Sequence, residues 1–494
     1  MTHMAATAAQ IRDCGMFIAG EWQDAAGRET FEDRDPYTGV TVARVPEGGA
    51  DDARRAVEAA AAAFPAWSAS PPAERQLVFL RAAELVEARR DEIVDMLARE
   101  TGAALGWGMF QVDFVAGLFR HGAGAAYAPL GQILPSDLPG AFAMGIRRPV
   151  GVVGAIATWN AALILSARAI TAPLACANTV VLKPSEESPW SGGLVWADVF
   201  QEAGLPAGAL NVVTHAPGGA DAVAAELIAS PHVRRLNFTG STETGRKVAE
   251  AAARHLKRVV LELGGYNPLI VLADADPEYA VDAAVFGAFF HQGQICMSAR
   301  RIIVERPIAD EVVPRLAEKT AGLKLGDPKE HDTIIGPLIN ERALATVKSR
   351  VDEAVSKGAR VLAGGDAVGP CFQATLLADV PADTDLARRE TFGPVASVEI
   401  VETPEDAVRR ANDTSYGLAA GVLTTDPDRG LAIAERLEAG IVHINDQPVH
   451  DEPQMPFGGV KDSGWGRLGG TFALDEFTDL RWVTVQSGRR PFPF

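Results

Sequence analysis

From Val150 onward, the sequence alternates short, β-branched apolar runs with stretches of helical periodicity. This alternation constrains the fold strongly, because parallel strands joined by helices must bury both faces of their sheet. It predicts a doubly wound α/β domain. The expected strands cover residues 152–156, 179–182, 211–213, 235–239 and 259–263.

A second alternating set follows and predicts a second α/β domain, which contains Cys296. Before the first set, the pattern favours helices over 50–64 and 72–99, with Leu77 and Leu80 on the apolar face of the latter. Two segments fit neither domain and have strand-like patterns, 129–149 and 477–485. The expected strands of the second set are 301–304, 395–401, 418–423 and 440–445.

Length and charge narrow the class of protein. A chain of 494 residues suggests two to three packed domains. Its 46 basic and 64 acidic residues give a net charge of −18, which argues against a nucleic-acid or anionic-membrane partner. The first 22 residues lack a basic start followed by an apolar core, and no apolar run could span a bilayer, so we expect a cytoplasmic protein.

Four cysteines occur, Cys14, Cys176, Cys296 and Cys371, and none belongs to a CxxC pattern. The nine histidines form no HExxH. We therefore expect a reduced compartment and no metal.

Cys296 is a candidate nucleophile. A lone cysteine is usually a small buried apolar side chain, but Cys296 follows Gly293 and Gln294 in a polar, glycine-containing segment. A few per cent of a free thiol is thiolate at neutral pH, which suits attack on a carbonyl. Glu262 ends an apolar run just before Gly264 and Gly265. A carboxylate there is either a solvated strand end or a functional base.

Six short motifs occur in one order along the chain. Together they resemble the NAD(P)-dependent aldehyde dehydrogenase family, over about residues 17 to 485. The resemblance implies that Cys296 attacks the aldehyde, that Asn160 stabilises the oxyanion, and that Glu262 activates the water that hydrolyses the thioester. The motifs are Trp159-Asn160, Lys183-Pro184-Ser185-Glu186, LELGG at Glu262, GQIC at Cys296, ETFGP at Glu390 and PFGGVKDSG from Pro456.

The resemblance also implies a cofactor site. Lys183 and Glu186 would hold the adenosine ribose, and the Glu186 carboxylate would repel a 2′-phosphate, which favours NAD over NADP. Gly240 and Ser241 either open a phosphate-binding helix or form an ordinary turn. The segment 464–469 matches GxGxxG but follows no apolar strand, so we reject it as a dinucleotide fingerprint. The implied cofactor residues are Trp159, Lys183, Glu186, Gly240, Ser241, Gly245, Glu390 and Phe392.

Three positions depart from the family's usual pattern: Thr158 replaces a proline, Arg389 replaces an acidic residue, and Ala161 replaces a bulky aromatic residue. Small residues beside the thiol leave room for a planar ring, and Arg168 could meet a ring substituent. This resembles the branch that oxidises aromatic aldehydes such as benzaldehyde, vanillin or salicylaldehyde. The implied substrate pocket consists of Ala161, Ile164, Arg168, Ile295, Met297, Phe110, Phe114, Val449 and Phe457.

The fold that the resemblance implies is aldehyde dehydrogenase-like α/β: two doubly wound α/β domains plus a small β oligomerisation element. Residues 1–128 and 150–261 would bind NAD, 262–470 would be catalytic, and 129–149 with 471–494 would join a neighbouring subunit in a homodimer or homotetramer. Two alternatives are a semialdehyde or aliphatic aldehyde dehydrogenase, and a catalytically idle structural protein. The presence of Cys296, Glu262 and Asn160 argues against the idle protein.

Overall fold

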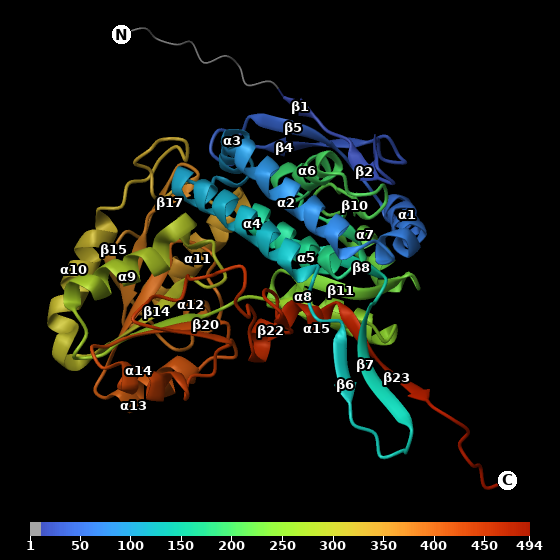
Figure 1. The fold of residues 1–494 in the computed structure, drawn as a ribbon. Helices are drawn as coiled ribbons and strands as arrows, with labels where there is room; N and C mark the ends of the chain where they lie inside the picture. The colour runs from blue at the N-terminus through green and yellow to red at the C-terminus, as the bar shows by residue number, and fades with distance from the viewer. Residues whose placement is uncertain (1–10) are drawn as a thin grey trace.

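The computed structural model describes residues 11–494, so the first ten residues of the first expected domain lie outside the described part (Figure 1). Two α/β sheets with their covering helices form two lobes, and a thin β arm projects from the first lobe (Figure 1). The predicted α/β fold with two parallel-stranded sheets and a small β element is confirmed. No helix within residues 11–494 is long and apolar enough to cross a membrane.

The first sheet has eight strands in the order β22-β12-β11-β8-β9-β10-β2-β3. Its five central strands are parallel, and β2 and β22 add to its edges in antiparallel register. The strands are β2 (Met16–Ile18), β3 (Glu21–Gln23), β8 (Val152–Ile156), β9 (Thr179–Lys183), β10 (Leu210–Val212), β11 (Val233–Thr239), β12 (Arg258–Glu262) and β22 (Gly464–Trp465).

Helices cover both faces of this sheet, which explains why β8, β9 and β10 are buried throughout. The prediction of a single helix over 72–99 was wrong, because the helix breaks at Arg89. Leu77 and Leu80 are 46% and 39% exposed, and α2 instead buries the face that contains Phe79. The helices are α1 (Ala50–Ser68), α2 (Pro72–Ala88), α3 (Arg90–Thr101), α4 (Leu105–Ala125), α5 (Ala162–Ala175), α6 (Val195–Ala203), α7 (Ala220–Ala229) and α8 (Thr242–Arg254), with a π-helical turn at Trp190–Leu194 before α6.

The second sheet has seven strands in the order β15-β18-β19-β14-β13-β20-β21, and only β15 is antiparallel. The strands are β13 (Asn267–Val271), β14 (Ala299–Glu305), β15 (Arg360–Ala363), β18 (Thr375–Ala378), β19 (Val395–Val401), β20 (Ala419–Leu423) and β21 (Ile441–Ile444). The helices of this lobe are α9 (Pro277–Phe289), α10 (Arg306–Ala321), α11 (Glu341–Ser356), α12 (Asp385–Arg388), α13 (Pro404–Asn412) and α14 (Pro427–Ala434).

Smaller elements complete the chain. One three-stranded sheet joins β1 (Arg12–Asp13), β5 (Thr41–Pro46) and β4 (Thr30–Arg34), and a short hairpin pairs β16 (Ala367–Val368) with β17 (Cys371–Phe372). Two short 3₁₀ turns span Phe290–Gly293 and Lys461–Ser463.

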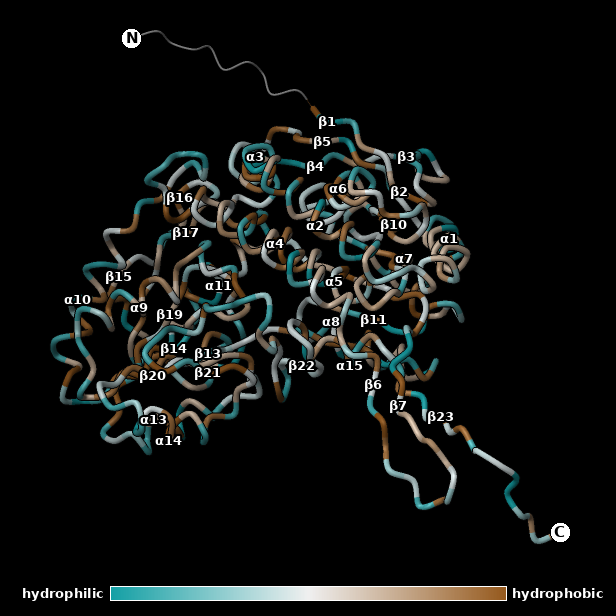
Figure 2. Tube along the Cα trace, viewed as in Figure 1, coloured by the Kyte–Doolittle hydropathy of each residue, from teal (hydrophilic) through white to brown (hydrophobic). Residues whose placement is uncertain are grey.

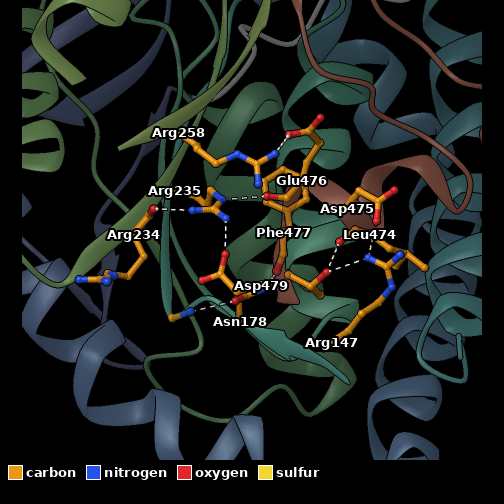
Figure 3. Close-up of polar contacts among 12 residues, drawn as sticks. Arg147, Asn178, Arg234, Arg235, Arg258, Leu474, Asp475, Glu476, Phe477 and Asp479 are labelled. Atoms are coloured by element: carbon orange, nitrogen blue, oxygen red, sulfur yellow. Dashed lines mark hydrogen bonds and ion pairs between the residues drawn. The ribbon is translucent and has the colours of Figure 1, made fainter. Parts of the chain in front are cut away.

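The arm is an antiparallel sheet of β6 (Gly131–Leu134), β7 (Ala141–Pro149) and β23 (Thr478–Gln486). Hydrophobic residues occur at intervals along its backbone trace (Figure 2), and Ile133, Leu480 and Trp482 are each more than 70% exposed. Helix α15 (Phe472–Glu476) leads into β23, and its junction with the first sheet is polar (Figure 3). There Arg235 donates to Asp479 at 2.5 Å, and the Asn178 amide donates to the Phe477 carbonyl at 2.9 Å. The arm is therefore fixed to the first lobe at its root.

Candidate active site

A cavity of about 1160 Å³ extends along the carboxyl ends of the first sheet's parallel strands and reaches Cys296. This is the edge at which doubly wound sheets bind ligands. Residues from both lobes line it, so one cavity contains both the expected cofactor residues and the expected catalytic residues. The predicted residues that line it are Trp159, Asn160, Lys183, Glu186, Gly240, Ser241, Glu262, Cys296, Glu390, Phe392 and Phe457.

The loop that precedes Cys296 is held in an unusual backbone conformation. His291 and Gln292 have φ angles of 48° and 51°, which non-glycine residues rarely adopt. The Gln292 amide donates to the carbonyls of Gly102 and Pro337, both at 3.0 Å. Strained conformations persist only where the surroundings hold them in place, so these bonds keep the loop rigid.

Two further contacts hold the nucleophile loop from the second lobe. Asn267, the first residue of β13, donates its amide to the Cys296 carbonyl at 2.8 Å. Buried Arg300 donates to the Gly393 carbonyl at 2.6 Å and also to the Gly293 carbonyl. The backbone at Gly293 and at Cys296 is thus held by side chains of β13 and β14.

The Cys296 thiol is partly buried. Burial raises its pKa, and the nearby Glu390 and Glu262 carboxylates raise it further, while the Arg168 guanidinium opposes them. The thiol form is therefore favoured, and forming the thiolate requires a base or a compensating positive charge.

Glu262 ends β12 and is 3% exposed. Neither of its carboxyl oxygens has a hydrogen-bond partner within residues 11–494. Burial raises the pKa of this carboxyl well above its ordinary value, and the cations of Arg168 and Arg467 only partly offset burial. A carboxyl with a raised pKa and free oxygens suits a general base that works near neutral pH.

Asn160 follows β8 and stands just before α5. Its side-chain amide donates to the Gln294 carbonyl at 3.0 Å, so the amide lies against the nucleophile loop. Its own main-chain carbonyl accepts from the Trp107 indole N–H at 3.2 Å. The amide is thereby held beside the segment that carries the thiol, where it could donate to an oxyanion.

At the other end of the cavity, Ser241 is the N-cap of α8, and its hydroxyl accepts from the Thr244 N–H at 3.3 Å. Lys183 is 4% exposed and ends β9. Gly245 does not line the cavity: a Cβ there would come within 2.4 Å of the Leu263 side chain, so it serves helix–sheet packing.

Between these ends lie Glu390 and two rings. A Glu390 oxygen accepts from the Gly265 N–H at 3.1 Å, and burial raises the pKa of this carboxyl to about 7. The Trp159 and Phe392 rings meet edge to face, with centroids 5.5 Å apart. These groups line the same cavity as Cys296.

Of the residues of the expected substrate pocket, only Phe457 lines this cavity, and the others lie outside its lining. Phe114, Ala161, Ile164, Ile295, Met297 and Phe457 belong to one apolar cluster, against which Cys296 and Val449 pack. Phe110 stands apart from this cluster: it is 39% exposed and stacks on Trp107.

Arg168 lies within the same region and is 2% exposed. It donates to both oxygens of Asp451, at 2.9 and 2.8 Å, and its guanidinium lies 4.4 Å from the Phe457 ring centroid and 5.3 Å from that of Phe114. Two of its nitrogens, Nε and Nη1, have no partner within residues 11–494. One nitrogen of the guanidinium, Nη2, is thus paired with Asp451.

Sequence reasoning missed several polar residues that hold the site, among them Asp451, Asn267, Gln292, Arg300 and His215. His215 approaches the Lys183 ammonium and lies two residues beyond an expected strand. Because parallel strands end at one edge, a polar residue there could have been singled out by the rule that singled out Lys183.

Comparison with known proteins agrees with this geometry. A profile of the aldehyde dehydrogenase family matches residues 22–483. A vanillin dehydrogenase from Pseudomonas fluorescens is 49% identical, covering 97% of this chain and 99% of its own, and an NAD(+) benzaldehyde dehydrogenase from Pseudomonas putida is 40% identical, covering 97% and 98%.

A solved structure is also similar along the whole chain. A salicylaldehyde dehydrogenase from Pseudomonas putida G7, complexed with salicylaldehyde, superposes with a TM-score of 0.96 at 41% identity, covering 98% of this chain and 100% of that one. The fold, the full-length matches and the cavity that contains Cys296 lead to one conclusion: this chain belongs to the aldehyde dehydrogenase family, and it is an oxidoreductase that acts on aldehydes.

Proposed function

We propose that this enzyme oxidises an aromatic aldehyde of the benzaldehyde, vanillin or salicylaldehyde type to its carboxylic acid, with NAD as oxidant. The observation that carries the proposal is the meeting of Cys296, Glu262 and Asn160 in one cavity, beside a contiguous apolar cluster. Relatives named for these three aldehydes cover nearly the whole chain.

Each residue has a distinct part in this reaction. The Cys296 thiol loses its proton to solvent, and its sulfur then forms a bond to the carbonyl carbon as the π electrons of the carbonyl move to oxygen. The Asn160 amide donates to the resulting oxyanion. Bound NAD would supply the hydride acceptor, and loss of the hydride from the tetrahedral adduct, as the oxyanion re-forms the carbonyl, leaves a thioester on Cys296. Glu262 takes a proton from water as the water attacks that thioester, and the carbon–sulfur bond breaks to release the acid.

The cavity fits a dinucleotide at its outer end. The free N–H groups at the start of α8 suit a pyrophosphate, because helix N-termini bind anions. The side chain of Glu186 is 28% exposed, so its carboxylate can accept from ribose hydroxyls. Dehydrogenases of this family use NAD(P); we infer a preference for NAD, since the Glu186 charge would repel a 2′-phosphate.

The apolar cluster supports an aromatic substrate. Ala161 is a small residue next to Asn160, and the Phe114 and Phe457 rings of the same cluster would offer surfaces on which a substrate ring could pack. The paired guanidinium of Arg168 lies over both of these rings. Its unpartnered nitrogens would donate to an oxygen on the substrate ring.

We also infer which lobe binds the cofactor and which part of the chain contacts a second copy. The lobe of the first sheet would hold the cofactor, and the lobe of the second sheet carries Cys296. The arm would join a second copy of the chain, because Leu130, Ile133, Leu480 and Trp482 on it are each more than 70% exposed.

A panel of aldehydes with both cofactors tests the substrate. We expect kcat/KM for benzaldehyde to exceed that for acetaldehyde by roughly 10- to 200-fold or more, the scale of a methylene-sized difference in an apolar pocket. Ala161→Phe should reduce this ratio by filling the ring space. Equal efficiency on both aldehydes, unchanged by Ala161→Phe, would refute the aromatic preference.

A further inference from the structure

Behind the outer end of the cavity lies a buried histidine that sequence motifs did not single out. His215 is 1% exposed and follows β10, which pairs in parallel register with β9. Its Nε2 lies 2.6 Å from the Nζ of Lys183, the last residue of β9. His215 does not line the cavity, so any effect on a ligand must pass through Lys183.

The other ring nitrogen defines the tautomer of His215. Its Nδ1 lies 2.9 Å from the Ala216 carbonyl oxygen, which can only accept a hydrogen bond. Nδ1 therefore carries the proton, and Nε2 offers a lone pair to the Lys183 ammonium. The pair is a neutral imidazole that accepts from a cation.

This arrangement limits what Lys183 can offer a ligand. An ammonium has three N–H groups. One donates to the Pro184 carbonyl at 2.9 Å and one to His215, while the third has no acceptor within residues 11–494. Lys183 itself lines the cavity, so this third N–H is the one available there.

Burial and the surrounding charges keep His215 neutral beside the Lys183 ammonium at neutral pH. Burial lowers the pKa of His215, and the Lys183 cation lowers it further, so the imidazole stays neutral. Burial lowers the pKa of Lys183 to about 8, with the carboxylates of Glu186 and Asp221 opposing burial. Glu186, 3.9 Å from His215, and Asp221, at the start of α7, are the acidic groups that face this pair.

We propose that His215 is a positioning residue of the cofactor site, which holds the Lys183 ammonium so that a single N–H faces the adenosine ribose. This rests on the proposed NAD site. One N–H suits a ribose hydroxyl, whereas a 2′-phosphate needs several positive donors to balance its charge. His215 thus favours NAD in two ways: it occupies one N–H of Lys183, and it adds no charge of its own.

Calorimetric titration of the full-length protein with NAD and NADP tests this, independently of turnover. His215→Leu removes the acceptor, so the Kd for NAD should rise about tenfold, the scale of one hydrogen bond to a charged group, and the ratio of NADP to NAD Kd should fall. His215→Gln keeps an acceptor oxygen and should restore NAD binding at pH 7.5. His232→Gln, an exposed histidine outside the cavity, is the matched control.

The pH profile separates positioning from plain packing. In the wild type, NAD binding should weaken only as the pH falls through the lowered pKa of His215, and therefore below 6.5, because a protonated imidazole cannot accept from Lys183. His215→Gln should lack this acidic limb. The same limb in His215→Gln, or an unchanged NAD Kd in a folded His215→Leu, would overturn the proposal while leaving NAD as the cofactor. Wild-type protein that binds no NAD at any pH would instead refute the proposed function, and this inference with it.

Discussion

Cys296 carries a thiol whose pKa is raised by burial and by the neighbouring carboxylates of Glu390, Glu262 and Asp451. The nucleophile therefore depends on groups that arrive with the ligands or shift during the reaction, rather than on a standing thiolate. Its backbone, in contrast, is fixed in advance by Asn267 and Gln292. The backbone around Cys296 is therefore held in place before the thiolate forms.

Cys296→Ala should abolish aldehyde oxidation and leave NAD binding unchanged within about twofold, because the sulfur forms the covalent bond and no cofactor contact is assigned to it. Steady-state NADH production and calorimetric NAD titration measure the two effects. Turnover that survives in the variant would show that another group is the nucleophile.

Glu262→Gln should separate the two halves of the reaction. Acylation of Cys296 should still yield a burst of NADH, whereas steady-state turnover should fall by about 10²- to 10⁴-fold, the scale of a general base.

In the wild type, kcat should increase with pH through the raised pKa of Glu262, because only the ionised carboxylate accepts a proton from water. Rapid mixing and a pH series measure both, and a burst lost in parallel with turnover would assign Glu262 to an earlier step.

At the scale of the element, the ion pair of Arg168 and Asp451 joins α5 to the segment after β21. Asp451→Leu would leave the Arg168 cation buried without its carboxylate, which typically costs about 3–5 kcal/mol. Denaturant unfolding should show this loss. Glu452→Leu, beside it but exposed, is the control and should cost little. Equal stability of the two variants would mean that Arg168 finds another partner.

Strand periodicity predicted β8 and β19 at their observed bounds, because buried parallel strands are continuous apolar runs. It did not predict β13, where Pro268 interrupts the pattern and a register shift accommodates it. The motifs predicted several residues that line the cavity, but Gly245 does not line it, and neither does any residue of the expected substrate pocket except Phe457. They could not predict the partners: Asp451 meets Arg168 across 283 residues, and only the folded chain brings such positions together.

For the whole molecule, the arm is the proposed site of association with a second copy of the chain. Replacing both Leu480 and Trp482 with Asp should weaken self-association, since these side chains are 71% and 77% exposed in the single chain and the change places charge on an apolar surface. Sedimentation or light scattering over a concentration series would measure it. The same double substitution should leave the Tm of the lobes nearly unchanged if they are folded by themselves. Unaltered association would place the contact elsewhere.

The pairing of β7 with β23 also bears on biosynthesis. Arg147 on β7 contacts Thr478 on β23, 331 residues later in the chain. At about 5–20 residues per second, a ribosome needs roughly 20 to 70 s to make that intervening stretch. During this time β7 has emerged with one backbone edge uncovered, and open strand edges invite pairing with other chains. The nascent polypeptide thus passes through an interval of aggregation risk that ends only when its last strand leaves the exit tunnel.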